Sequence, residues 1–206
     1  MQPGPPAPQP ISSPKLLLGE GVEEARFFKA LLKTLGISHI QVEDYKGKSK
    51  LQDYLAAQPP RSGFSQLVSL AVTRDADADP AGAFQSVCSS LQNAGLPVPN
   101  GMGQRTQGPP AVSVLILPNN MSPGMLEDLC LEAVRADPAM PCVDEFFQCV
   151  LQRAKRQPSI PPKAKVHAWL ASQLDSDLRL AEAAEKGYWP WSSPVFHPLK
   201  QFLQSL

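Results

Sequence analysis

Short apolar runs that end abruptly in polar or turn-forming residues dominate the first 120 residues of the chain. Each run has the length and continuity of a strand that is buried on both faces of a parallel sheet. The runs occupy residues 15–18, 40–42, 67–73 and 112–117. We therefore expect four buried strands in this part of the molecule.

Helical patterns separate these runs. Apolar residues recur at helical spacing from Phe27 to Leu35, and Gly36 is well placed to end that helix. A brief helix is expected to end near Ala57, and Pro80 suits the first turn of a helix that ends near Ala94. Strands and helices in alternation predict an α/β fold of Rossmann-like type, with a mostly parallel four-stranded sheet flanked by helices.

The two ends of the chain have different patterns. Residues 1–14 include six prolines and almost no charge, which predicts a disordered, Pro-rich arm. We assign residues 15–135 to the α/β core. Residues 136–206 contain only helical patterns and an aromatic, Pro-rich stretch, so they predict a helical C-terminal extension that packs on the core.

Composition narrows the class of protein. A chain of 206 residues suits one domain. Its 19 Lys and Arg balance its 19 Asp and Glu, so the net charge produces no overall electrostatic attraction to nucleic acid or to a membrane. The apolar runs are far shorter than a membrane span, and no signal-peptide pattern is present. The four cysteines lack CxxC spacing, and only three histidines are present, which favours packed, reduced thiols in a cytoplasmic protein. The oligomeric state is left open.

Carboxylates follow two of the predicted strands directly. Glu20, Glu23 and Glu24 come after the first strand, and Asp75 and Asp77 come after the third. Because the carboxyl ends of parallel strands line the ligand crevice of an open α/β sheet, we expect these side chains to meet at one edge. Like charges that meet there repel one another unless a cation lies between them, which predicts a site for a hard divalent cation.

The order of these motifs resembles the Toprim domain, which topoisomerases, primases and nucleases of the OLD (overcoming lysogenization defect) type share. The matching elements are residues 20–24 and 75–77, with Asp79 extending the second motif. Residues 27–32, 74–77 and 125–130 are more specifically similar to a small, stand-alone, OLD-related Toprim family of uncharacterised proteins. The resemblance covers most of the chain from Lys15 onward.

The resemblance implies phosphoryl transfer that depends on Mg²⁺ or Mn²⁺. It implies metal ligation by five carboxylates, namely Glu20, Glu24, Asp75, Asp77 and Glu127, with Glu20 and Asp75 also acting in catalysis. Two positions depart from the family pattern: Glu24 stands where Asp is more common, and Gly19 replaces the usual β-branched residue. Glu23 is an alternative ligand to Glu24.

A phosphoryl-transfer site also needs a cation that contacts the phosphate. The basic stretch 153–165 contains Lys165, which we predict as the catalytic lysine because it opens a helix, and Lys163 is nearly as good. A second basic group, Lys46, Lys48 and Lys50, is interpreted as an ordinary solvent-exposed turn.

The leading functional hypothesis is therefore a metal-dependent nuclease that hydrolyses phosphodiesters of DNA or RNA. The alternative is a catalytically idle metal-binding module that binds a protein partner or a nucleotide. A receiver-like fold with a Mg²⁺-assisted phosphoryl site ranks third, because no clear lysine follows the last strand.

Overall fold

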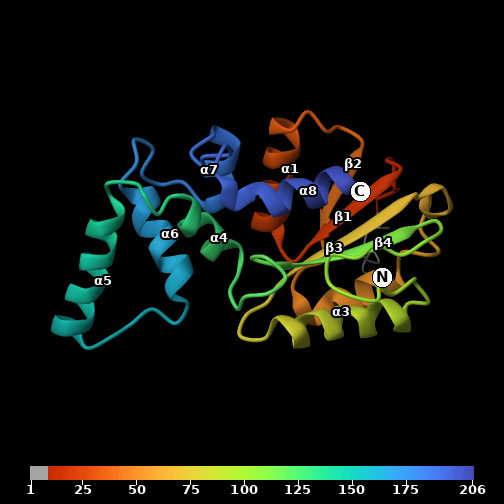
Figure 1. The fold of residues 1–206 in the computed structure, drawn as a ribbon, viewed down its shortest axis with the longest axis horizontal. Coiled ribbons are helices and arrows are strands. Elements are labelled where there is room, and N and C mark those ends of the chain that lie inside the picture. Colours follow the sequence, from red (N-terminus) through yellow and green to blue (C-terminus); the bar gives the residue numbers. More distant parts are fainter. Residues whose placement is uncertain (1–8) are drawn as a thin grey trace, which may run out of the picture.

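A computed structural model describes residues 9–206 of the chain, and residues 1–8 lie outside the description. The layers of the fold are visible in Figure 1: a central sheet with helices above and below it, and a helical arm that extends from one end. Figure 1 also shows that the arm lies beyond the same end of the sheet as α4.

The sheet contains four strands, all parallel, as the sequence predicts. They are β1 (Lys15–Gly19), β2 (Ile40–Asp44), β3 (Ser69–Asp75) and β4 (Ala111–Leu117). The spatial order is β2-β1-β3-β4, and Leu17 of β1 pairs with Val42 on one side and Ala71 on the other. The α/β class with a parallel four-stranded sheet is confirmed.

Eight α-helices complete the described part of the chain. Three connect the strands: α1 (Val22–Thr34), α2 (Leu51–Ala56) and α3 (Pro80–Asn93). Five follow β4: α4 (Leu126–Ala133), α5 (Met140–Ala154), α6 (Pro161–Ala171), α7 (Leu180–Lys186) and α8 (His197–Ser205). The short helix α7 is the one that the sequence pattern did not reveal, because two turns are too few for a clear period.

Alternate residues of each strand enter two separate hydrophobic clusters. On β1, Leu17 packs with α1 and the C-terminal helices, whereas Leu16 and Leu18 pack with α2 and α3 on the opposite face. All three side chains are fully buried. This explains why the strand reads as a continuous apolar run: both of its faces need apolar side chains.

The connections leave a crevice between β1 and β3. From β1 the chain moves outward to β2, and from β3 it moves outward in the other direction to β4. The loops that follow β1 and β3 therefore diverge, and ligands of open α/β sheets bind at such a switch point. The acidic motifs follow these two strands.

The segment before β1 is packed against the body of the protein, which corrects part of the predicted arm. Ile11 is buried, and its backbone N–H donates to the Ser62 carbonyl over 2.9 Å. Ser12 donates its backbone N–H to the Gln41 side chain. The apolar Ile11 explains the difference, since it fills a pocket beside Gly63. The part of the arm before Gln9 lies outside the described residues.

The C-terminal helices share one hydrophobic cluster with α1 and one face of the sheet. Trp189 is central: its ring stacks on Trp169 with centroids 5.0 Å apart, and its Nε1 donates to the Leu180 carbonyl over 3.0 Å. Beyond this cluster, Cys142 and Cys149 are exposed, contrary to the expectation that all four thiols are packed. Among residues 9–206, no helix combines the length and hydrophobicity needed to cross a bilayer.

Trp189→Ala should lower the free energy of unfolding by about 3–5 kcal/mol, because it removes a large buried ring and leaves a cavity. The side chain is 1% exposed. Urea denaturation monitored by circular dichroism measures the change. Leu174→Ala is the control, because Leu174 is fully exposed and its loss should change stability by less than about 0.5 kcal/mol. Equal effects of the two substitutions would contradict a packed C-terminal half.

Candidate metal centre

A cavity of about 200 Å³ lies at the carboxyl edge of the sheet, at the switch point. Charged side chains from four parts of the chain line it: the end of β1 and start of α1, the end of β3, the start of α4 and the start of α6. These residues are Glu20, Glu23, Glu24, Asp75, Glu127 and Lys163. The predicted convergence of carboxylates that are distant in sequence is therefore present.

Glu24 is the most buried of these carboxylates, with 6% of the residue exposed. One of its oxygens, Oε2, accepts the Glu20 backbone N–H over 2.9 Å, and Oε1 contacts the Thr73 hydroxyl. Burial, and then the charge of Asp75, raise the pKa of Glu24 to about 8. In the absence of a cation, burial therefore favours the protonated form of Glu24 near neutral pH.

The Thr73 hydroxyl lies between two acceptors, and a hydrogen bond that it donates to Glu24 lowers the pKa of that carboxyl group, against the effect of burial. The hydroxyl oxygen lies 3.1 Å from the Leu18 carbonyl oxygen as well as beside Glu24. A hydroxyl has one proton to donate, and a carbonyl oxygen can only accept. When Thr73 donates to Leu18, the contact with Glu24 is a hydrogen bond only if the carboxyl group of Glu24 is the donor.

Asp75 and Glu127 form the opposite wall. The Asp75 Oδ1 accepts the backbone N–H of Leu126, the first residue of α4, over 3.0 Å. Burial, followed by the charges of Glu20 and Glu127, raises the pKa of Asp75 to about 7. Burial also raises the pKa of Glu127, whereas nearby Lys163 opposes this shift. The Lys163 Nζ lies 3.8 Å from Glu127 Oε1.

Other acids near the cavity have structural partners. Glu23 accepts the Ala181 N–H over 3.0 Å at the start of α7, and Asp128 accepts the Met125 N–H over 2.9 Å at the start of α4. Asp79 caps α3 by accepting the Gly82 N–H. Of the two adjacent acids in each pair, Glu24 and Glu127 therefore have the carboxylates that are free of helix capping.

Asp77 is not brought into the cavity lining. Its backbone has a positive φ of 51°, and its carboxylate accepts a hydrogen bond from Lys48 over 2.8 Å at the surface. The backbone of Asp77 pairs with Gly124 in an isolated bridge, which fixes this turn. Its role as a metal ligand remains a prediction, and contact with the cavity would require the Lys48 pair to break.

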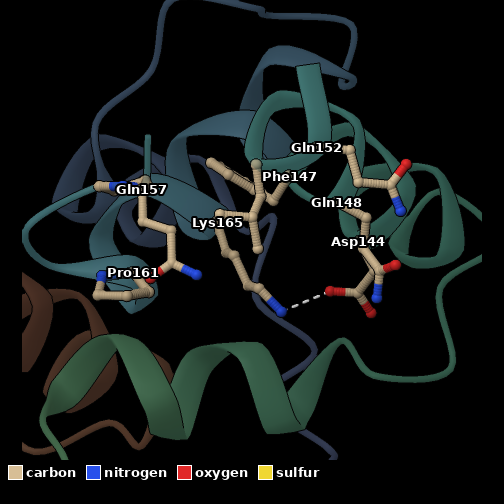
Figure 2. Close-up of a pocket in the computed structure, with 9 residues that line it drawn as sticks. Asp144, Phe147, Gln148, Gln152, Gln157, Pro161 and Lys165 are labelled. Atoms are coloured by element: carbon tan, nitrogen blue, oxygen red, sulfur yellow. Dashed lines mark hydrogen bonds and ion pairs between the residues drawn. The ribbon is translucent and has the colours of Figure 1, made fainter. Parts of the chain in front are cut away.

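Lys165 also lies elsewhere, which corrects its predicted place beside the carboxylates. Its Nζ pairs with Asp144 Oδ1 of α5 at 2.5 Å, in a groove between α5 and α6 that Figure 2 shows. Lys163, two residues earlier, faces the candidate metal centre instead. Residues two apart in a helix point in nearly opposite directions, so only one of the two lysines can serve this cavity.

Gly19 and Glu24, the two positions that differ from the expected Toprim pattern, are neighbours in space. A Cβ added at Gly19 would lie 3.5 Å from both Cγ and Cδ of Glu24 and 3.3 Å from the Ala25 nitrogen. The longer acid therefore occupies space beside the bare backbone of Gly19. The Cβ itself would make ordinary contact with Glu24 and a tight contact with the Ala25 backbone, so the further atoms of a β-branched residue would crowd both.

The donor set fits a hard divalent cation in its chemistry, because buried carboxylates with raised pKa values repel one another when they ionise. The groups are not pre-assembled: within residues 9–206, no three His, Cys, Asp or Glu side chains are arranged closely enough to hold a metal ion. Hydrogen bonds from Thr73 and Leu126 hold Glu24 and Asp75 in their present positions. A cation would have to compete with these contacts.

A family model described as "Protein of unknown function (DUF3226)" matches residues 14–206. The chain belongs to this family. The DUF3226 match includes every residue of the candidate metal centre. No curated protein matches the chain.

Two solved structures are similar to this DUF3226 protein. Both are of the C-terminal region of the OLD protein of Xanthomonas campestris pv. campestris, one phased with mercury and the other with iodine. Each is 15% identical, covers 94% of this chain and 98% of its own, and has a TM-score of 0.42. At that score the likeness carries no argument about the site.

We expect the metal-free protein to lose stability as the pH rises. The pKa of Glu24 is raised from 4.5 to about 8, so between these values the unfolded chain has released a proton that the folded chain retains. The free energy of unfolding therefore falls across this range, by a few kcal/mol, and levels off above it. Urea denaturation in EDTA from pH 4.5 to 8.5 measures the slope.

Glu24→Gln should remove part of this slope, because an amide can donate to Thr73 and accept from Glu20 without ionising. The raised pKa of Asp75 should leave a smaller slope of the same sign. Glu132→Gln is the matched control, since Glu132 is exposed and should leave the slope unchanged. A wild-type slope that survives Glu24→Gln in full would show that another group causes it.

The contact between Gly19 and Glu24 predicts non-additive effects of substitution. Gly19→Val should destabilise the protein by about 1–3 kcal/mol through overpacking. Adding Glu24→Asp, which withdraws one methylene, should recover part of this loss, giving a coupling energy above about 0.5 kcal/mol. Denaturant unfolding of the two single variants and the double variant measures it. If the stability effects of the two single substitutions simply add in the double variant, the proposed contact between positions 19 and 24 is contradicted.

Proposed function

We propose that this DUF3226 protein binds Mg²⁺ or Mn²⁺ at the candidate metal centre and hydrolyses nucleic-acid phosphodiesters. The observation that carries this proposal is the convergence of Glu20, Glu24, Asp75 and Glu127 with Lys163 around one cavity at the switch point of the sheet. The Toprim-like order of the acidic motifs along the chain also supports it.

The proposed division of roles follows from position and charge. Glu20, Glu24, Asp75 and Glu127 would hold the cation, and Asp77 would join them if it leaves Lys48. A bound cation would neutralise these carboxylates and polarise a phosphate oxygen. Lys163 is half-exposed at the cavity, so its ammonium group can contact an oxygen of the same phosphate. Lys163 thus replaces Lys165 as the proposed phosphate-contacting lysine.

One observation favours the alternative of an idle metal-binding module. Asp77 is tied to Lys48, and the remaining carboxylates of residues 9–206 are not arranged as a ready metal site. A protein of this kind would bind a cation weakly and use the cavity for a nucleotide or a protein partner without cleaving nucleic acid.

Asp75→Asn should lower cleavage of plasmid DNA or single-stranded RNA in Mn²⁺ by roughly 100-fold or more, because it removes a charged ligand. The amide oxygen of the variant can still accept the Leu126 N–H, so the fold should be retained. Lys163→Gln should lower the rate by roughly 10-fold to 100-fold. Gel electrophoresis of the products measures the rates.

Lys33→Gln provides the control for lost positive charge, since Lys33 is exposed on α1 and does not line the cavity. Mn²⁺ binding is measured in parallel by electron paramagnetic resonance. Binding that Asp75→Asn abolishes, without cleavage of any nucleic acid by the wild type, would favour the idle module. Cleavage that Asp75→Asn leaves intact would overturn both functions at this cavity.

A further inference from the structure

Positive charge is concentrated in one segment of a chain that is neutral overall. Residues 146–174 contain no Asp or Glu, but they contain Arg153, Lys155, Arg156, Lys163 and Lys165. The rest of the chain therefore contains 14 of the 19 basic residues and all 19 acidic residues. The segment has a net charge of +5 and the rest of the chain has −5, so the local field differs strongly from the average.

Most of this segment lies in the α5–α6 arm, residues 140–171, which projects from the end of the molecule (Figure 1). The arm also contains Asp144 and Glu145, so its own net charge is +3. In α5, only Met140 and Val143, both near its start, are buried. Further along, Phe146 is 55% exposed and Leu151 is 42% exposed. A 15-residue helix with so little packing is poorly explained by stability alone, because helices in proteins depend mainly on burial of an apolar face.

A groove of about 590 Å³ runs between the two helices of the arm, which is in the size range of ligand pockets. Its surface combines apolar and amide groups. Figure 2 shows Gln148 and Gln152 of α5 on one side, Gln157 and Pro161 on the other, and Lys165 reaching between them to Asp144. Phe147 and Leu151 supply apolar surface.

The groove and the candidate metal centre share a wall. The first turn of α6 contributes Pro161 to the groove and Lys163 to the cavity, while Lys165 again faces the groove. A chain-like ligand that lies in the groove therefore needs to pass only this turn to reach the carboxylates. Arg153, Lys155 and Arg156 are exposed where the arm reverses direction between the two helices.

We propose that the α5–α6 arm binds an unpaired nucleic-acid strand and leads it into the candidate metal centre. Gln148, Gln152 and Gln157 would bond to base edges, the apolar surface would contact base faces, and Arg153, Lys155 and Arg156 would contact phosphates. This inference rests on the proposed function, and it adds a strand type and a binding surface to it.

The chemistry of the groove favours a single strand over a duplex. Amide side chains and an apolar surface inside a groove can reach base edges and faces only when the bases are unpaired and unstacked. A duplex would meet the basic residues through its phosphates but would leave the groove unused. Acidic peptides match the charge, and their carboxylates can accept from the glutamine amides, but they offer no base faces to the apolar surface.

Binding is tested without cleavage by fluorescence anisotropy in EDTA, using full-length protein and a labelled 20-nucleotide single strand. We expect at least about tenfold weaker binding of a duplex of the same sequence, and of a strand in which abasic sites replace the bases. Arg153→Gln with Arg156→Gln should reduce the slope of log affinity against log salt by roughly 1.4, because each lost phosphate contact contributes about 0.7.

The matched control is Lys29→Gln with Lys33→Gln, which removes the same charge from the exposed face of α1 and should leave the slope unchanged. Gln152→Ala with Gln157→Ala should weaken binding of the normal strand roughly threefold to tenfold and leave that of the abasic strand unchanged. Both glutamines are exposed, so the fold should tolerate the change.

Equal binding of single strand, duplex and abasic strand would overturn the proposal, as would equal effects of the arm and α1 double variants. Displacement of the strand by polyglutamate at equal charge would show a non-specific polyanion surface and would also overturn it. Because these measurements contain no divalent metal, they succeed or fail independently of cleavage. Cleavage without arm-dependent binding would preserve the proposed function and reject the arm.

Discussion

Repulsion between buried carboxylates is the constraint on which this molecule depends. Glu24 and Asp75 come from opposite sides of the switch point, and the crossing of the chain leaves them in one small cavity. Burial holds both pKa values above the ordinary range; the charge of Asp75 adds to the shift at Glu24, and the charges of Glu20 and Glu127 add to the shift at Asp75. A fold selected for stability alone would place apolar side chains there, since a buried acid destabilises the folded chain whenever it ionises. The cost is consistent with a site that is kept for binding.

The helices that follow the sheet complete this site. Glu127 lies in the first turn of α4 and Lys163 in the first turn of α6, so two of the charged side chains that line the cavity come from beyond β4. The same helices share a hydrophobic cluster with α1, and Glu23 of α1 accepts the backbone N–H of Ala181 in the first turn of α7. The C-terminal half therefore positions charged groups as well as covering the sheet.

The sequence predicts the fold well because buried parallel strands leave a strong local signal, and it locates Glu20, Glu24 and Asp75 because strand ends are determined by the same signal. Glu127, in the first turn of α4, is expected only from the resemblance to the Toprim domain. The sequence does not predict the orientation of Asp77, because the left-handed turn and the pair with Lys48 involve a residue 29 positions away. It also misplaces Lys165. The sequence alone leaves open where the helix starts, and a start at Pro161 reverses which of the two lysines faces the carboxylates. The burial of Ile11 is also not predicted, because a single apolar residue among prolines gives no repeating pattern of hydrophobic positions.

The packing of Gly19 against Glu24 has a consequence for the detection of distant relatives. Motif descriptions usually treat positions as independent, so a chain that differs at both of these places is penalised twice. A side chain at position 19 would contact Glu24, so the residues that the two positions tolerate are expected to depend on each other. Profiles that score this pair jointly should recover homologues that ordinary column-by-column scoring rejects.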